Sequence, residues 1–365
     1  MANSELVLPS LNPDVTRAET LPAAAYRDSI WFERQVERVF PCTWHGYPSP
    51  ELPQQARQLL PWTLLPGALD EPLLWARSEA GQLRLLSNVC THRGYVLVEQ
   101  ACSLTSIRCG YHGRRFALDG QMLNAPAFET ACDFPRASDH LRQPPFGALG
   151  PLQLVSLLPE TSLEEVLRPV HERTGHLPWE RLVVALEGCR EYEVRANWAL
   201  WCDNYLEGLH IPYLHPTLNG AIDMNRYETL PLQHGSLQIG LASGNDHALS
   251  APPGHPDHGR AVAGYYFHLF PTTMINIYSW GLSINLLQPL APERTRITYL
   301  TYVWNETLRE RGAGAKLDQV ELEDDRAVER TARGMRSRLY GRGRYSPAFE
   351  AGVHRFHQLL LEAMA

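Results

Sequence analysis

The sequence predicts an α+β chain in which a small β-rich module is inserted into a larger α+β domain. Between about residues 44 and 153, short alternating apolar runs are punctuated by glycines, a pattern typical of small β structures with tight turns. After residue 154 longer strand-like stretches appear, and the chain ends in two segments of helical periodicity. We therefore expect an N-terminal segment over 1–43, the β-rich module over 44–153 and the larger domain over 154–365.

The first element expected along the chain is an N-terminal helix. Residues 24–39 place Tyr26, Ile30, Trp31 and Val36 near helical spacing, which predicts an amphipathic helix that packs on the larger domain. Residues 162–168 read as a short helix with Ser162 as its N-cap, ended or kinked by Pro169. Strands are expected at 192–194, 263–270, 274–280, 283–288 and 296–303, with a Pro- and His-rich loop at 244–259. Helices are expected at about 317–339 and 348–364.

The composition narrows the class of protein. Apolar residues make up 44% and charged residues 20% of 365 residues, which is an ordinary globular balance. The net charge of −7 argues against a nucleic-acid or anionic-membrane partner. No apolar run approaches a bilayer-spanning length, and residues 1–17 lack the pattern of a secretory signal, so we expect a cytoplasmic protein. Seven cysteines, an odd number, form a poor disulfide framework and fit a reducing compartment.

The strongest local signal is a quartet of potential metal ligands. Cys90 and His92 occur as C-x-H, and Cys109 and His112 follow 16 residues later as C-x₂-H. Each pair lies on a short, glycine-bounded segment, so two loops could close around one site. Two Cys and two His suit either tetrahedral zinc or a [2Fe–2S] cluster in which two His replace two Cys.

A second constellation follows at residues 204–215. Glu207 and His210 are three residues apart and share a face of a helix. His210 and His215 are five apart, so their imidazoles would converge only if the prolines in this segment kink or bulge the helix. Taken alone, two histidines at this spacing are more often structural.

A third ligand to such a site should be a carboxylate, since two His and one Asp or Glu leave open positions on Fe(II). In the helix expected at 317–339, Asp324 falls on a largely apolar stripe and Asp325 beside it. A buried carboxylate without a partner is costly, which favours metal ligation by Asp324. The alternative is that the acidic run at 321–326 is a solvated helix face.

The two Cys–His segments resemble a known protein family. The segments CTHRG and CGYHG resemble the two boxes of Rieske iron–sulfur proteins. The resemblance implies that Cys90 and Cys109 hold the inner iron of the cluster, and His92 and His112 the outer one. Arg114 is a departure, because the oxygenase branch of the family usually has Trp there.

Further segments are similar to the catalytic subunits of Rieske non-haem iron oxygenases, nearest to their choline monooxygenase-like, ring-hydroxylating branch. They are NWALWCDNYLEGLHIPYLHP at 197–216, YYFHLFPTTMINIY at 265–278, EDDRAVERTARGM at 323–335 and GRYSPAFEAGVHRFHQLL at 343–360. The resemblance implies a small all-β Rieske domain inserted in a larger helix-grip-like domain with an antiparallel sheet and C-terminal helices. It also implies mononuclear Fe(II) bound by His210, His215 and Asp324, with Glu207 and the nearby Asn204 as catalytic residues.

The same resemblance implies the reaction and its partners. O₂ would be a co-substrate, and a small organic molecule would be hydroxylated, demethylated or dihydroxylated. The family's catalytic subunits are usually homotrimers, in which His112 of one chain meets Glu207 of the next. No G-x-G-x-x-G follows a strand, so electrons from NAD(P)H would come through a separate flavin reductase, a ferredoxin or both. A Rieske-cluster electron carrier or sensor without oxygenase activity is the alternative, and a zinc-ribbon protein a further one.

The substrate is open between a quaternary ammonium compound and an aromatic or alicyclic compound. A cation would require aromatic faces and a carboxylate, and Tyr265, Tyr266, Phe267 and Trp280 could supply such a cage. The candidate pocket residues are Leu206, Tyr213, Leu218, Met224, Met274, Asn276, Tyr278 and Asn285.

Overall fold

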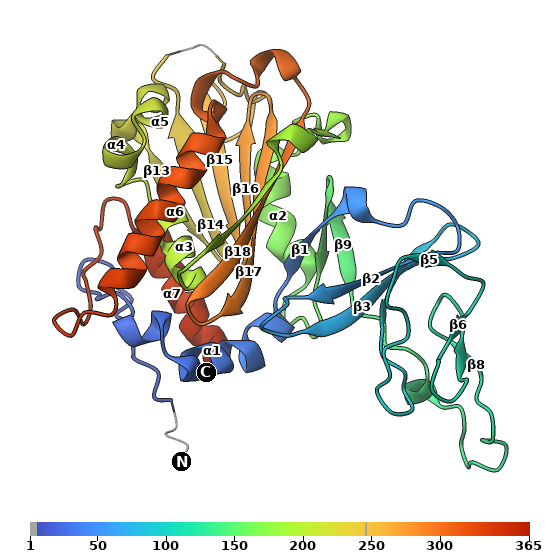
Figure 1. Cartoon of the computed structure of the whole chain (residues 1–365). Coiled ribbons are helices and arrows are strands. Elements are labelled where there is room, and N and C mark those ends of the chain that lie inside the picture. Colours follow the sequence, from blue (N-terminus) through green and yellow to red (C-terminus); the bar gives the residue numbers. More distant parts are fainter. Residues whose placement is uncertain (1–5, 245–246) are drawn as a thin grey trace.

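A computed structural model describes residues 6–244 and 247–365, and its largest element is an eight-stranded antiparallel sheet (Figure 1). The strands run in the order β11-β18-β17-β16-β15-β14-β13, and β12 also pairs with β18. Their bounds are β11 (Val183–Val184), β12 (Arg190–Val194), β13 (Glu228–Leu232), β14 (Gly235–Leu241), β15 (Val262–Leu269), β16 (Thr273–Tyr278), β17 (Gly281–Ala291) and β18 (Arg294–Val303). All five strands expected from the sequence in this region are present.

Helices cover both faces of this sheet, which explains why its central strands are buried along almost their whole length. On one face lie α3 (Trp198–Tyr205), α6 (Leu317–Gly334) and α7 (Ala351–Met364). On the other face α2 (Leu163–Thr174) packs its apolar residues against the sheet. Side chains alternate between the two layers, so the strand residues on the α3–α6–α7 side are the ones that can reach a site between helices and sheet.

The β-rich module projects from one side of the sheet domain (Figure 1). It consists of three small antiparallel sheets; two of them enclose a core of their own, while the sheet β1-β10-β9 packs its apolar residues into the cores of the larger domain. Their strands are β1 (His45–Pro48), β2 (Gln58–Leu64), β3 (Glu71–Arg77), β4 (Leu83–Ser87), β5 (Cys102–Ser103), β6 (Ile107–Arg108), β7 (Arg115–Phe116), β8 (Met122–Asn124), β9 (Phe146–Leu149) and β10 (Leu152–Val155). The α+β architecture predicted from the sequence, with an inserted β module and C-terminal helices, is confirmed.

The N-terminal segment packs on the sheet domain. Instead of one helix over 24–39, it forms a 3₁₀ turn at Ala23–Tyr26 and then α1 (Ser29–Arg38). The indole of Trp198 in α3 donates a hydrogen bond of 2.8 Å to Gln35 in α1, and Phe40 lies edge-on to the same indole at 5.5 Å. Ile30, expected on the apolar face, is 42% exposed.

Three other expectations need correction. Ser162 caps α2 as predicted, but Pro169 lies inside that helix, which continues to Thr174. The helix expected to reach residue 339 ends at Gly334, and the last helix begins at Ala351 rather than 348. In the loop expected at 244–259, residues 245–246 lie outside the described part of the chain. Its later part is anchored by Asp257, which is fully buried and accepts hydrogen bonds from Arg173, Arg260 and Tyr265. None of the described helices combines the length and apolar character needed to cross a membrane.

Candidate metal centres

The structure brings His210, His215 and Asp324 together beneath the end of α3. The chain leaves α3 at Tyr205 and continues as two short helices, α4 (Ile211–Leu214) and α5 (Pro216–Ala221). His215 stands at their junction with φ −122° and ψ 74°, outside the helical region. This break brings the two imidazole centroids to 5.1 Å, and one ligand atom from each of the three residues lies within 4.8 Å of the others. The imidazoles of His210 and His215 therefore converge, as the prolines in this segment allow.

Each imidazole has a carboxylate on one nitrogen and turns the other toward Asp324. His210 Nδ1 lies 2.6 Å from Glu207 Oε1, and His215 Nδ1 lies 2.8 Å from Glu323 Oε2. The two Nε2 atoms lie 3.6 Å and 2.9 Å from Asp324 Oδ1. Carboxylates behind histidines fix the tautomer and ring orientation that metal ligation needs. Burial opposes charge on His215, but the hydrogen bonds to Asp324 and Glu323 outweigh it and raise the pKa of the imidazole.

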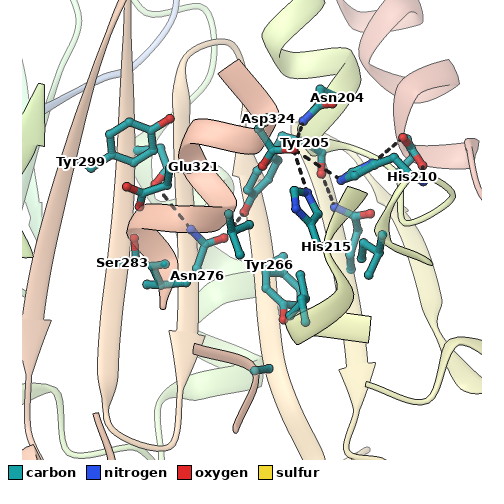
Figure 2. Close-up of a pocket in the computed structure, with 18 of the residues that line it drawn as sticks. Asn204, Tyr205, His210, His215, Tyr266, Asn276, Ser283, Tyr299, Glu321 and Asp324 are labelled. Carbon is teal, nitrogen blue, oxygen red and sulfur yellow. Dashed lines mark hydrogen bonds and ion pairs between the residues drawn. The ribbon is translucent and has the colours of Figure 1, made fainter. Parts of the chain in front are cut away.

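Asn204 contacts this group through its side-chain amide. Its Nδ2 donates a hydrogen bond of 2.8 Å to Asp324 Oδ1, the same oxygen that the imidazoles approach (Figure 2). Asn204 therefore orients the carboxylate. The donor set of two imidazoles and one carboxylate, with further carboxylates behind the imidazoles, fits Fe(II) and leaves coordination positions for other ligands.

The burial pattern of α6 differs from the expected stripe. Its fully buried residues are Asp325, Val328 and Ala332, while Thr331 is exposed. Asp325, expected beside the stripe, is on the buried face and accepts a hydrogen bond of 3.1 Å from the indole of Trp201. Asp324 lies at the edge of that face, one step around the helix, where it meets the histidines. Here an acidic residue occupies the core-facing position because an indole N–H needs an acceptor there.

A cavity of about 80 Å³, partly open to solvent, adjoins the three residues between α6 and the sheet (Figure 2). Among the predicted pocket residues, Leu218, Asn276, Tyr278 and Asn285 line it. The lining also includes residues that sequence reasoning missed: Trp201, Tyr205, Tyr227, Gln238, Ser283, Tyr299, Ala313, Leu317, Val320 and Glu321. Most of them could not be found from local pattern, since they come from strands and helices far apart in the chain.

Four predicted pocket residues do not line this cavity. Leu206 is fully buried in the main core and Met274 packs in the same core. Tyr213 is 82% exposed because it lies on the outer side of α4. Met224 is partly buried against a neighbouring core cluster. Proximity in sequence to the iron segment suggested Leu206, Tyr213 and Met224, and a place on an expected strand suggested Met274, but helix and strand direction turns these side chains elsewhere.

The proposed aromatic cage is only partly correct, for the same reason. Tyr266 lines the cavity, whereas its neighbours Tyr265 and Phe267 face the core on the α2 side. Trp280 stacks on Tyr278 behind the cavity wall at 5.3 Å. Strand alternation allows only one residue of the run 265–267 to face the site.

Glu321 brings a carboxylate into this aromatic lining. It stands one turn before Asp324 on the same side of α6, and its Oε2 is buried with no hydrogen-bond partner among the described residues. Burial, reinforced by the charges of Asp318, Asp325 and Asp324, raises the pKa of Glu321 to about 8. The spacing i, i+3 from Asp324 was the sequence signal that could have identified it.

The other quartet lies on two similar loops at the far end of the β-rich module. In one, Gly94 N–H donates to Cys90 O, and in the other Gly113 N–H donates to Cys109 O. Both glycines have positive φ, near 70°, a conformation that a side chain would strain. The two loops thus hold equivalent turns.

The four side chains converge between these loops. Both cysteines are 2% exposed, and the rings of His92 and His112 lie 4.8 Å apart. His92 Nδ1 is buried and has no hydrogen-bond partner among the described residues. An orphaned ring nitrogen beside two buried thiols is the expected state of a cluster-binding site, so these residues fit a [2Fe–2S] cluster with mixed Cys and His ligation.

Comparison with known families decides between the remaining classes. Residues 65–142 match the Rieske [2Fe–2S] domain, and residues 184–365 match the ring hydroxylating alpha subunit (catalytic domain). This chain is a Rieske non-haem iron oxygenase catalytic subunit. The oxygenase therefore uses a Rieske cluster, mononuclear iron and O₂, with NAD(P)H supplied through a separate reductase as is typical of the family. A zinc-ribbon protein and a stand-alone electron carrier would lack the catalytic domain.

Relatives of the oxygenase are named for choline and for carnitine. Choline monooxygenase, chloroplastic, from Arabidopsis thaliana is 27% identical over 94% of this chain and 82% of its own length. The carnitine monooxygenase oxygenase subunit of Escherichia coli (strain K12) is 27% identical over 98% of this chain and 97% of its own. These similarities confirm the branch of the family that the sequence segments indicated.

Solved structures share the fold of the oxygenase. A quaternary ammonium Rieske monooxygenase superposes with a TM-score of 0.73 at 24% identity, covering 97% of both chains. Naphthalene 1,2-dioxygenase from Rhodococcus sp. superposes with a TM-score of 0.68 at 18% identity, covering 94% of both. The same scaffold thus serves proteins named for cationic and for aromatic substrates, so the choice of substrate depends on the cavity.

Proposed function

We propose that this oxygenase monooxygenates a small quaternary ammonium compound bound in the cavity beside His210, His215 and Asp324. One observation carries the proposal: the cavity combines aromatic faces with the carboxylate of Glu321, whose buried Oε2 has no hydrogen-bond partner in the described part of the chain. A trimethylammonium group is attracted to aromatic faces and cannot donate hydrogen bonds, so it needs a carboxylate only as a counter-charge.

The electrostatics of the cavity favour a cation over a neutral ring. Without a cation, burial keeps Glu321 largely protonated near neutral pH, since its pKa is raised to about 8. A cation nearby stabilises the ionised form and recovers part of that cost. A neutral aromatic substrate would gain from the tyrosine faces but would leave the carboxylate without a partner. The similarity to choline and carnitine monooxygenases supports the same choice.

The metal roles proposed from the geometry are the following. His210, His215 and Asp324 would hold Fe(II), and the two loops would hold the cluster through Cys90, Cys109, His92 and His112. When bound, iron supplies activation of O₂ and the cluster supplies electrons one at a time. Asn204 orients Asp324, while Glu207 fixes His210.

The arrangement of the two centres supports a homotrimer. In one chain the loops of the β-rich module lie at the opposite end of the molecule from α4 and α5 (Figure 1). His112 is exposed at that far end. We propose that it faces Glu207 of a neighbouring chain, so that each active site is assembled from two subunits. A flavin reductase or a ferredoxin would be the electron donor, and the seven free cysteines support a reducing compartment such as the cytoplasm.

The test is a substrate panel with reconstituted enzyme and a surrogate reductase. Choline, L-carnitine and γ-butyrobetaine are compared with indole and naphthalene, following substrate-dependent O₂ uptake and product by mass spectrometry. Each ammonium compound is paired with its isostere in which carbon replaces nitrogen, which removes the positive charge and keeps the shape. We expect product from at least one cation and much less from its isostere.

Other outcomes separate the parts of the proposal. Equal oxidation of a cation and its isostere would mean that charge is not recognised. Oxidation of indole or naphthalene alone would reassign the cavity to aromatic substrates while leaving the oxygenase activity intact. Mass spectrometry also distinguishes insertion of one oxygen atom from two.

A further inference from the structure

Arg114 is a buried cation beside the cluster loops. It directly follows Gly113 of the second loop and precedes β7, and it stands where Rieske oxygenases usually have Trp. Its side chain is 4% exposed, an unusual state for a guanidinium, which is ordinarily solvated or fully paired. Such a residue calls for a physical explanation.

The guanidinium joins the two loops. Its Nη1 lies 3.2 Å from Thr91 Oγ1, and Thr91 stands between Cys90 and His92 of the first loop. Its backbone carbonyl accepts a hydrogen bond from Cys109 N–H of the second. Arg114 therefore contacts one loop with its side chain and the other with its main chain, which fixes its charge beside the two loops.

Aromatic rings and one carboxylate complete the surroundings. The guanidinium lies 4.5 Å from the ring centroid of Phe128 and 5.3 Å from that of Phe134. Asp139 Oδ1 is 3.8 Å from Nη1, too far for a direct hydrogen bond, and Nε has no partner among the described residues. The positive charge is therefore only partly neutralised.

Solvent screens Arg114 less than it screens the other charges nearby. Arg93, Arg108 and Arg115 are all exposed, and the Asp139 side chain is 16% exposed. Charges held away from water act over longer distances than exposed ones.

We propose that Arg114 is a potential-setting residue: its fixed positive charge raises the reduction potential of the Rieske cluster in this oxygenase. Reduction adds one electron, supplied by the reductase, and increases the negative charge of the cluster by one without making or breaking a bond. A buried cation stabilises the reduced form more than the oxidised form. Charge and hydrogen bonding around a cluster are the general determinants of its potential.

The test measures the reduction potential of the full-length protein by anaerobic titration, followed by visible and EPR spectra. In Arg114→Met, which keeps much of the side-chain length, we expect the potential to fall by about 59 mV or more, a tenfold change in the one-electron equilibrium constant. Arg114→Lys keeps a charge and should retain most of the potential. Arg115→Gln removes an exposed cation one residue away and is the matched control, with a much smaller shift expected.

A second variant is expected to shift the potential in the opposite direction, and it leaves the side chain at residue 114 unchanged. Asp139→Asn removes the carboxylate facing Arg114 and should raise the potential. The proposal is overturned if Arg114→Met leaves the potential unchanged or if Arg114→Lys lowers the potential as much as Arg114→Met does. It is also overturned if Asp139→Asn lowers the potential. If Arg114→Met fails to assemble the cluster, Arg114→Lys and Asp139→Asn still decide through their direction. The potential requires no substrate, so failure here is distinct from failure of the proposed function.

Discussion

Glu323→Gln is expected to weaken iron binding at the mononuclear site without affecting the Rieske cluster. The Glu323 carboxylate lies 2.8 Å from Nδ1 of His215, whose side chain is fully buried. The carboxylate requires a proton on Nδ1 and thereby leaves Nε2 free to face the metal. A glutamine can instead turn its amide and donate to Nδ1, which favours the wrong tautomer.

The magnitude follows from the exposure of the pair. A hydrogen bond to a charged group contributes about 1.5–3 kcal/mol, and the 23% exposure of the Glu323 side chain favours the lower half of that range. A loss of about 1.4–2 kcal/mol corresponds to a roughly 10- to 30-fold higher Kd for Fe(II), within the range found when partners of metal-bound histidines are replaced.

The assay is anaerobic Fe(II) titration of protein whose mononuclear site has been stripped with a mild chelator, with the visible spectrum of the cluster as internal reference. Glu329→Gln is the matched control, because Glu329 is on the same helix and its carboxylate accepts a hydrogen bond from Arg195 N–H, away from the site. An unchanged Kd in Glu323→Gln, or an equal increase in both variants, would refute the reasoning.

Three further predictions follow from the same structure. Glu207→Gln alters the Nδ1 contact of His210 as Glu323→Gln alters that of His215, so it should raise the Kd for Fe(II) to a similar extent and leave the cluster intact. In protein saturated with Fe(II) it should also slow electron transfer between the centres at least tenfold, as measured by iron content and single-turnover reoxidation of the cluster. Normal turnover of the iron-loaded variant would contradict this. Glu321→Gln should raise the KM for a cationic substrate about tenfold, and the KM for its uncharged isostere less than about threefold. Both are measured by O₂ uptake, and equal changes in the two KM values would exclude a role of Glu321 in charge recognition. Burial lowers the pKa of His45 and of His268 to about 4, so the unfolded chain binds more protons than the folded one below pH 6.5. Stability should therefore fall as pH decreases from about 6.5 to 4, by up to roughly 3 kcal/mol for each histidine, and His45→Gln should flatten the pH dependence of the midpoint in urea unfolding.

How much the sequence could reveal depended on how local each feature is. The two cluster loops are complete within short segments, so spacing alone brought Cys90 and His92 together with their counterparts. The iron triad required a helix break at His215 and the approach of α6 from more than a hundred residues away. Here the resemblance to a family selected Asp324, while periodicity alone placed it on the wrong part of the helix face.

The cavity lining was the least predictable part. Asn276 and Asn285 were identified because they lie on neighbouring strands of the expected sheet, whereas Tyr213 was misplaced by its closeness to the histidines in sequence. Glu321 was missed because an acidic run normally indicates a solvated face. Its i, i+3 spacing from Asp324 was the available signal, and the packing of α6 onto the sheet shows that it points inward.

Helical segments carry the candidate iron ligands and strands form much of the cavity wall, and this division limits how the enzyme can diversify. Every candidate iron ligand lies on α6 or on the α4–α5 segment, while much of the facing cavity wall, including Asn276, Ser283 and Asn285, lies on strands β16 and β17. Replacing wall residues therefore reshapes the space for substrate without moving the iron. Adding or deleting one residue within α6 would instead rotate Glu321, Glu323 and Asp324 together by about 100°. Evolution and engineering are thus free to explore the strands but are confined to point substitutions on the helix.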